Sequence, residues 1–244
     1  TLRVSEATIS RFTRALGYKG FADMKLDLAS ESTSKDLFSN LPAEMREGDA
    51  LSDISFKLLG ALSLSMAETQ KNIVYEDIQK VVSDLLKAPE VIFFGVGGAV
   101  SVCEEAVHLF LKAGIKATFY RDGYTQQVVA ATVSENITVV GISHTGMTED
   151  VASALSVARA RGAKTIAITS NLVSPVALAA ETSLWTWTPD TPQIPLYGDY
   201  LEGRVCQIYI IYVIYLGVLL QSRGSVPEAL EITAETLRAY FSRA

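Results

Sequence analysis

Cysteine and histidine are scarce in this chain of 244 residues, which contains two of each. Cys103 and Cys206 stand inside apolar helical patterns, and neither has the CxxC or Cys/His spacing of a metal site. Two separated cysteines exclude a disulfide-built scaffold and favour a reducing, cytoplasmic location. From the residues alone we expect no metal ion and no cofactor.

The sequence also lacks a Pro/Gly/Ser-rich linker, a low-complexity tract and an internal repeat. Hydrophobic residues make up 49% of the chain and charged residues 20%, which is typical of a well-packed soluble protein. The length suits one large domain or one and a half smaller ones. The first residue is Thr1 and no signal-peptide pattern follows, so we expect a fragment whose beginning is missing.

Residues 205–220 form an almost wholly apolar run. Sixteen residues fall short of the ~20 that span a bilayer, and Gln207 with three tyrosines interrupts the run. We therefore expect no membrane span but a helix buried in a core or between subunits.

From residue 91 onward, short apolar runs alternate with helical patterns. The alternation predicts an α/β fold, a doubly wound, mostly parallel five-stranded sheet with helices on both faces. Strands are expected at 91–96, 116–120, 137–143, 164–170 and 183–188, and helices at 99–113, 125–134, 148–161 and 174–180. Two longer helices are expected before them, at 51–70 and 75–87, with Ile78, Val81, Val82 and Leu85 of the second facing inward.

The third expected strand runs directly into the loop Ser143-His144-Thr145-Gly146-Met147-Thr148. A strand that ends in hydroxyls and Gly and turns into a helix N-terminus is typical of a phosphate cradle, because backbone N–H groups and the helix dipole converge there. The loop has no Lys, which excludes a nucleotide-hydrolysing P-loop. A second glycine turn, Gly95-Val96-Gly97-Gly98, follows the first strand.

Besides a part in phosphate binding, the glycine turn at 95–98 has two other interpretations. A dinucleotide-binding fingerprint needs Gly where this chain has Val100, although Asp122 could supply the ribose-binding acid. Alternatively, the glycines serve close packing alone. His144 could donate to a phosphate or sugar hydroxyl, carry a proton, or be a loop histidine without a special partner. Glu149 and Asp150 are explained as acids of a first helical turn.

The first residues predict a short basic helix. Residues 1–25 contain five Lys or Arg against two acids, although the net charge of the whole chain is −6. Ser5 is a good N-cap, and the apolar stripe Ile9, Phe12 and Leu16 leaves Thr8, Arg11 and Arg14 toward solvent. A basic end on an acidic body suggests that this element meets a polyanion.

Three motifs together resemble a known family. The loop at 143–148 looks like the Ser-x-Ser/Thr-Gly-x-Thr loop of the sugar isomerase (SIS) domain, a phosphosugar-binding fold. Residues 4–21 resemble the end of the helix-turn-helix of RpiR-type bacterial transcription regulators, which place this domain before an SIS domain. Residues 203–208, Gly-Arg-Val-Cys-Gln-Ile, are similar to the opening of a late helix in that family.

The resemblance implies a regulator, not an enzyme, whose partners are operator DNA and a phosphorylated sugar or sugar-acid effector. It implies the C-terminal part of a helix-turn-helix domain at 1–32, a linker and connecting helix at 33–74 and an SIS domain at 75–244. A homodimer or homotetramer is expected, with the helix at 205–220 between subunits.

Two sets of site residues follow from the resemblance. The effector would be bound by Gly97, Gly98, Ser101, Ser143, His144, Thr145, Gly146, Thr148 and Glu202. DNA would be read by the helix that opens at Ser5, with Thr8 and Arg11 toward base edges and Arg14 and Lys19 toward phosphates.

One departure from the family pattern concerns the first loop. The family's usual Ser, whose hydroxyl reaches the ligand, is replaced by Ala99. Either the effector differs or this loop contributes only backbone N–H groups, with Ser101 as a substitute donor. Two other functions stay open: an SIS-type sugar-phosphate isomerase with His144 or Glu202 as base, and a dimerisation module that has lost its ligand.

Overall fold

The structure is a computed structural model that describes residues 13–14, 18, 46, 48–187, 201–222 and 225–242. Its contacts divide the chain into two compact units, residues 1–58 with 190–199 and residues 59–189 with 200–244. In the first unit, the described residues include an ion pair of 2.6 Å between Lys57 and Asp49. The second unit contains the whole sheet and is described below.

Five parallel strands form one sheet in the order β2-β1-β3-β4-β5. The strands are β1 (Val91–Phe94), β2 (Ala117–Tyr120), β3 (Thr138–Ile142), β4 (Lys164–Thr169) and β5 (Thr182–Trp185). Every residue of β1 and β3 is buried, as expected for strands covered on both faces. The predicted doubly wound α/β fold with five strands is confirmed, and every pairing in the sheet is parallel.

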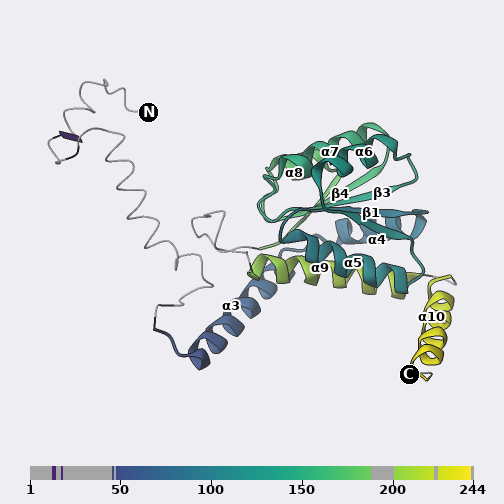
Figure 1. Ribbon diagram of the computed structural model, residues 1–244, viewed down its shortest axis with the longest axis horizontal. Helices are drawn as coiled ribbons and strands as arrows, with labels where there is room; N and C mark the ends of the chain where they lie inside the picture. The colour runs from purple at the N-terminus through teal and green to yellow at the C-terminus, as the bar shows by residue number, and fades with distance from the viewer. Residues whose placement is uncertain are drawn as a thin grey trace. The chain divides into compact units, whose positions relative to one another are not determined.

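Helices cover both faces of the sheet (Figure 1). One face carries α4 (Tyr75–Lys87), α5 (Ala99–Lys112) and α9 (Leu201–Gln221). The other face carries α6 (Gly123–Thr132), α7 (Glu149–Ala160) and α8 (Pro175–Ala179). Two further helices, α3 (Leu51–Lys71) and α10 (Ser225–Phe241), complete the described elements. The helix α10 has no counterpart in the sequence prediction.

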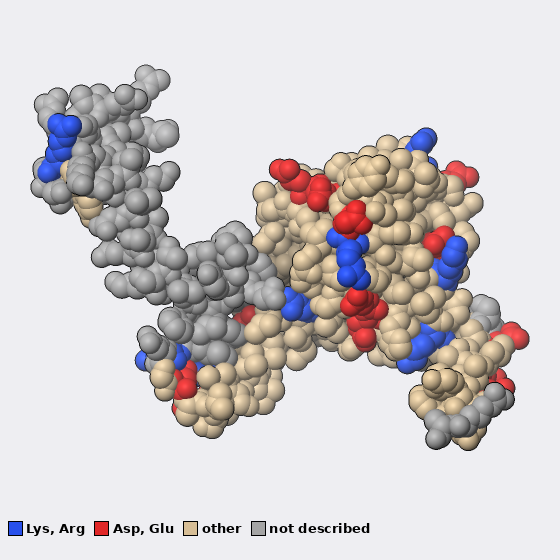
Figure 2. Space-filling model, in the orientation of Figure 1, with Lys and Arg blue, Asp and Glu red and all other residues tan. Residues whose placement is uncertain are grey.

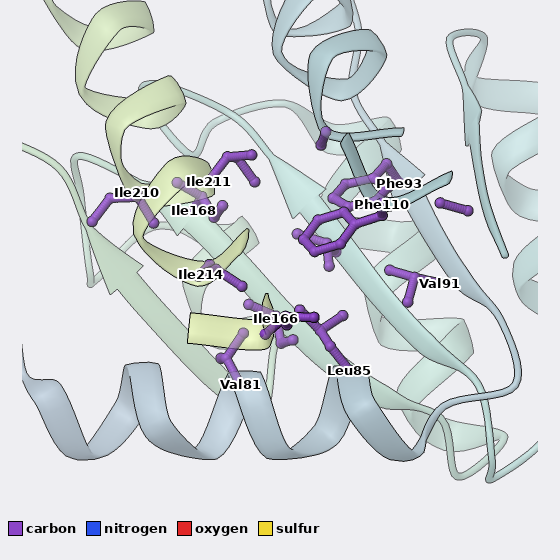
Figure 3. Close-up of a cluster of buried hydrophobic side chains, with 14 of the residues drawn as sticks. Val81, Leu85, Val91, Phe93, Phe110, Ile166, Ile168, Ile210, Ile211 and Ile214 are labelled. Carbon is purple, nitrogen blue, oxygen red and sulfur yellow. The ribbon is translucent and has the colours of Figure 1, made fainter. Parts of the chain in front are cut away.

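The larger apolar core lies between the sheet and the layer of α4, α5 and α9 (Figure 3). Phe93 of β1 stacks on Phe110 of α5, with 6.0 Å between ring centroids. The four α4 residues expected to face inward, Ile78, Val81, Val82 and Leu85, are all buried there. On the other face α7 approaches β3 closely, and a Cβ added at Gly141 would lie 2.5 Å from Leu155 Cδ1.

The apolar helix α9 is longer than the run seen in the sequence. Its 21 residues are long and apolar enough to cross a membrane by length and composition, a test that core helices also pass. Here α9 packs against α4 and α5 and buries residues along one side, among them Cys206, Ile210, Ile211 and Ile214. It is therefore a core helix of the sheet domain, with Tyr212, Leu216 and Leu220 left exposed.

Charges on the sheet domain are mixed in sign. On the face drawn in Figure 2, basic and acidic side chains lie interspersed over this unit. Several form ion pairs, such as Lys80 with Glu181 at 3.0 Å and Lys116 with Glu90 at 3.0 Å. A surface of this kind does not favour binding of a polyanion.

Replacing Phe110 by Ala tests the core. Phe110 is 1% exposed, so Phe110→Ala is expected to lower the free energy of unfolding by about 3–5 kcal/mol, because it leaves a cavity against Phe93. Phe56, which is 80% exposed on α3, gives the matched control, and Phe56→Ala is expected to change stability by about 0.5 kcal/mol or less. Urea denaturation measures both, and equal losses would contradict this core.

Candidate functional site

The two loops singled out in the sequence lie side by side. β1 and β3 are neighbours, with Phe94 paired to Gly141, so the loops that follow them leave the same edge of the sheet. β2 lies on the far side of β1 and β4 on the far side of β3, which makes the gap between β1 and β3 the point where strand order reverses. Ligands of open parallel sheets bind at this point.

Hydroxyl groups converge in the loop between β3 and α7. Ser143 Oγ and Thr148 Oγ1 share a hydrogen bond of 2.9 Å, and the Gly146 N–H donates to Ser143 Oγ at 3.2 Å. Thr145 Oγ1 accepts from the Met147 N–H at 3.2 Å. Ser143 is buried and Thr145 and Thr148 are half-buried. The sequence predicted these residues as a group, and the structure brings them together.

The conformation and surroundings of the loop at position 146 require glycine. Its φ of +70° lies in the left-handed region, and an added Cβ would overlap with the side chain of Ser174. The Gly146 carbonyl accepts from the Val176 N–H at 3.0 Å, which ties the loop to the first turn of α8. The loop is therefore held in one conformation by an element far along the chain.

The main chain of His144 anchors the loop to the end of β4. Its carbonyl accepts three hydrogen bonds, from the Ser170 N–H at 2.8 Å, Ser170 Oγ at 2.7 Å and Thr169 Oγ1 at 3.0 Å. The His144 ring lies against Gly203 of α9, where an added Cβ would overlap with it.

Burial lowers the pKa of His144 from 6.5 to about 4. The imidazole is therefore neutral at pH 7. From the sequence, His144 could have been a cationic phosphate donor or a proton carrier. This buried environment favours neither role near neutral pH.

The helices that begin at the two loops have no side-chain caps. α7 starts after Thr148 and α5 after Gly98, and neither N-cap residue makes a side-chain capping bond. By contrast, Asp122 caps α6 by accepting from the Thr125 N–H at 2.8 Å, and Ser174 caps α8. The first amides of α5 and α7 thus lack the side-chain acceptors that serve α6 and α8, which suits an anion at this edge.

Asp122 therefore has a structural role at the start of α6. Hydrogen bonds from Thr125 hold the pKa of its carboxyl below the usual range. This position replaces the interpretation of Asp122 as a ribose-binding acid, because the carboxylate is already bound to a helix N-terminus.

The glycine turn after β1 is open to solvent on one side. Gly97 has φ +58°, and a Cβ added there would meet no atom within 4 Å. Ser101 is exposed, and its hydroxyl donates to the Gly98 carbonyl at 2.9 Å. Gly97, Gly98 and Ser101 thus lie together beside the Ser143 loop, with Ala99 half-buried between them.

Gln126 is a residue of this region that the sequence reasoning missed. It is fully buried on α6, and its Nε2 donates to the Tyr120 carbonyl at 2.7 Å and the Gly95 carbonyl at 3.2 Å. These bonds tie the end of β2 to the start of the glycine turn. The available signal was a pair of amides, Gln126 and Gln127, at the start of an otherwise largely apolar short helix.

The remaining predicted residues fall in two places. Glu202, on the first turn of α9, is 8% exposed and adjoins Gly203, which contacts His144. Arg14 is exposed in a helical segment, whereas the other DNA-site residues lie outside the described residues: Ser5, Thr8, Arg11 and Lys19. Among the described side chains there is no group of three or more His, Cys, Asp or Glu that could hold a metal ion.

Comparison with known proteins decides the family. Residues 84–198 match the SIS domain model, and residues 1–35 match the helix-turn-helix domain of the rpiR family. An uncharacterized HTH-type transcriptional regulator of Haemophilus influenzae is 31% identical over 216 residues, which are 88% of this chain and 74% of that protein. The HTH-type transcriptional regulator RpiR of Escherichia coli K12 is 28% identical over 221 residues, 89% of this chain and 72% of that protein.

The chain belongs to the rpiR family of helix-turn-helix transcriptional regulators with an SIS domain. The resemblance seen in the sequence is thereby confirmed. The NanR protein of Vibrio vulnificus, solved with ManNAc-6P, shares the fold with a TM-score of 0.73 at 23% identity, covering 98% of this chain and 83% of that one. The protein is thus a DNA-binding regulator, and its sheet domain has the SIS fold.

Substitution of Gly146 tests the loop geometry. Gly146→Ala is expected to cost about 3 kcal/mol or more of stability, because left-handed strain adds to the overlap with Ser174. Gly97→Ala is the matched control and is expected to cost only about 1–2 kcal/mol, since its φ is positive but its surroundings are open. Chemical denaturation compares the two, and equal costs would show that Gly146 is not enclosed.

The neutral His144 predicts a pH dependence of stability. Its folded pKa of about 4 lies below the unfolded value of 6.5, so the unfolded chain binds a proton that the folded chain does not as pH falls through this window. Between pH 7 and pH 5 the wild type is expected to lose about 2 kcal/mol that His144→Gln does not lose. Urea denaturation at both pH values measures the difference, and parallel losses would contradict a buried neutral imidazole.

Proposed function

We propose that this regulator senses a phosphorylated sugar or sugar acid whose phosphate binds between β3 and α7. The observation that carries the proposal is the convergence of the Ser143 and Thr148 hydroxyls, 2.9 Å apart, with the N-terminus of α7, which has no side-chain cap. Hydroxyls and backbone amides donate to phosphate oxygens, and the helix dipole favours the negative charge.

The acids at the start of α7 are compatible with an anion there. Asp150 is directed at the N-terminus of α6, where a Cβ on Gly123 would overlap with its carboxyl group. That helix end stabilises the Asp150 charge. Glu149 is exposed, so water screens it. The loop therefore needs no Lys or Arg to bind a phosphate.

The sugar portion extends from Ser143 toward Gly97–Ser101 on one side and Glu202 on the other. The open space beside Gly97, and the burial of Glu202 next to the Gly203 that contacts His144, support this direction. Ala99 supplies no hydroxyl, so the first turn contributes backbone N–H groups and Ser101. NanR, a protein of the same fold, was solved with ManNAc-6P, which supports this ligand class.

The effector acts on DNA binding through the assembly of the protein. A ligand shifts a conformational equilibrium only by binding one arrangement more tightly than another. The exposed side chains Tyr212, Leu216 and Leu220 of α9 support a homodimer or homotetramer, because exposed apolar rows mark subunit contacts. Operator DNA is read by the segment around Arg14, in a cytoplasmic protein that regulates carbohydrate metabolism.

We propose no catalytic role for this site. An SIS-type isomerase would use His144 or Glu202 as its base, and Gly203, the chain neighbour of Glu202, lies against the His144 ring. The observation against it is the rpiR-family helix-turn-helix match at 1–35, which a metabolic isomerase does not need. A coupled isomerase assay on hexose and pentose phosphates is expected to show no turnover, and turnover would support the enzyme instead.

Replacing Ser143 tests the phosphate site. Hexose 6-phosphates, N-acetylhexosamine 6-phosphates and 6-phosphogluconate are screened for a concentration-dependent rise in melting temperature. Ser143→Ala is expected to weaken binding of the best ligand ten- to a hundredfold, which is about 1.5–3 kcal/mol for a lost hydrogen bond to a charged group.

Ser153, an exposed serine of the same helix, gives the control. Ser153→Ala is expected to respond to ligand like the wild type. A response that survives in Ser143→Ala, or a wild type that no phosphorylated sugar stabilises, would contradict the proposed site.

A further inference from the structure

A cluster of buried polar side chains lies beyond the phosphate loop. Its members come from three elements distant in sequence: the C-terminal half of α3, the segment after β5 and the first turns of α9. All are less than 9% exposed. They are Ser65, Thr69, Thr186, Glu202 and Gln207.

Hydrogen bonds connect this cluster to the phosphate loop. The Thr186 N–H donates to the Thr169 carbonyl at 3.0 Å, and Thr169 Oγ1 donates to the His144 carbonyl at 3.0 Å. The next residue, Trp187, donates its N–H to Thr69 Oγ1 at 2.9 Å. Thr186 is thus two bonds away from the His144 main chain.

The helix α9 reaches the cluster from the other side. Gly203 contacts the His144 ring, and Gln207 stands one turn further along the same buried face. Glu202 lies at the start of that face, in the first turn of α9, and is 8% exposed. Loop and cluster therefore form one continuous polar region.

The cluster contains polar atoms that the fold does not satisfy. Gln207 Nε2 and Thr186 Oγ1 are both buried and have no hydrogen-bond partner in the described part of the chain. Buried polar groups without partners destabilise a protein, so their presence beside a binding loop indicates a ligand that supplies the partners.

We propose that Glu202, Gln207 and Thr186 bind the hydroxyl-bearing end of the effector and select a sugar phosphate without a second anionic group. This rests on the proposed phosphate site at Ser143. The Gln207 amide donates to a ring or acyl oxygen, the Thr186 hydroxyl donates or accepts, and the Glu202 carboxylate accepts from sugar hydroxyls.

The selection against sugar acids follows from charge. Glu202 is the only charged residue among the eight buried residues of α9. A carboxylate in a partly desolvated site repels the second anionic group of a sugar-acid phosphate, whereas it accepts hydrogen bonds from a neutral sugar. The subsite therefore narrows the effector to neutral hexose or acylamino-hexose phosphates.

The first test uses stability without ligand. Gln207→Met removes an unsatisfied amide at similar volume and is expected to raise the melting temperature by about 2–4 °C. Gln126→Met is expected to lower the melting temperature, because its Nε2 donates to the carbonyls of Gly95 and Tyr120, and these two bonds outweigh the relief of its own unpaired Oε1. A lower melting temperature for Gln207→Met would overturn the proposal, since it would show that the amide serves the fold.

The second test uses affinity, measured by calorimetry with hexose 6-phosphates, N-acetylhexosamine 6-phosphates and 6-phosphogluconate. The wild type is expected to bind the best neutral sugar phosphate at least about tenfold more tightly than 6-phosphogluconate. Gln207→Met is expected to lose about tenfold or more for the neutral ligand. Glu202→Gln is expected to narrow the gap between the two ligand classes by relieving the repulsion.

Gln221→Met is the matched control, on the same helix but exposed at its far end, and is expected to bind like the wild type. Wild-type affinity in Gln207→Met, or preference of the wild type for 6-phosphogluconate, would overturn the subsite. If Ser143→Ala still loses binding in that case, the phosphate site stands without it. If no phosphorylated sugar binds the wild type, both proposals fall.

Discussion

The anchoring of the His144 main chain to the end of β4 is the constraint on which the site depends. Three hydrogen bonds to one carbonyl, from Ser170 and Thr169, hold the loop after β3 against its neighbour strand. Gly146 then turns the chain in the left-handed conformation that favours glycine, and its carbonyl accepts a hydrogen bond from Val176 of α8. With both fixed, the Ser143 and Thr148 hydroxyls meet at the start of α7.

The proposed phosphate site offers an anion dipoles instead of a formal charge. α6 and α8 have side-chain caps from Asp122 and Ser174, while α5 and α7, at the reversal of strand order, have none. Burial keeps His144 neutral, so no nearby histidine cation adds to the field. Binding through oriented donors makes affinity sensitive to geometry, which suits a sensor that must distinguish two arrangements of the protein.

The sequence predicted the architecture well because each strand and helix has a local period. The five strands and the helices from 51 to 180 lie within three residues of their expected bounds, as is usual for periodic segments. The hydroxyl-rich loop at 143–148 could also be recognised, because its residues are contiguous, and its role as a ligand site stays a prediction.

Features that depend on contacts distant in sequence were not found. Gln126 bonds to the carbonyls of Tyr120 in β2 and of Gly95 after β1, and Trp187 meets Thr69 of α3 only through the fold. The pKa of His144 depends on its burial beside Gly203, some 60 residues away by number, which no local pattern encodes. Ala99 could be recognised as a departure from the family pattern. Its effect on ligand binding, however, depends on where Ser101 and the backbone amides of the turn lie.

The central claim is that a phosphate binds where β3 meets α7, and a crystal structure with a bound hexose 6-phosphate tests it most directly. The account predicts phosphate oxygens within hydrogen-bond distance of the Ser143 and Thr148 hydroxyls and of the first amides of α7. A phosphate bound elsewhere on the protein, with the Ser143–Thr148 hydrogen bond unchanged and no ligand atom beside it, would contradict the account.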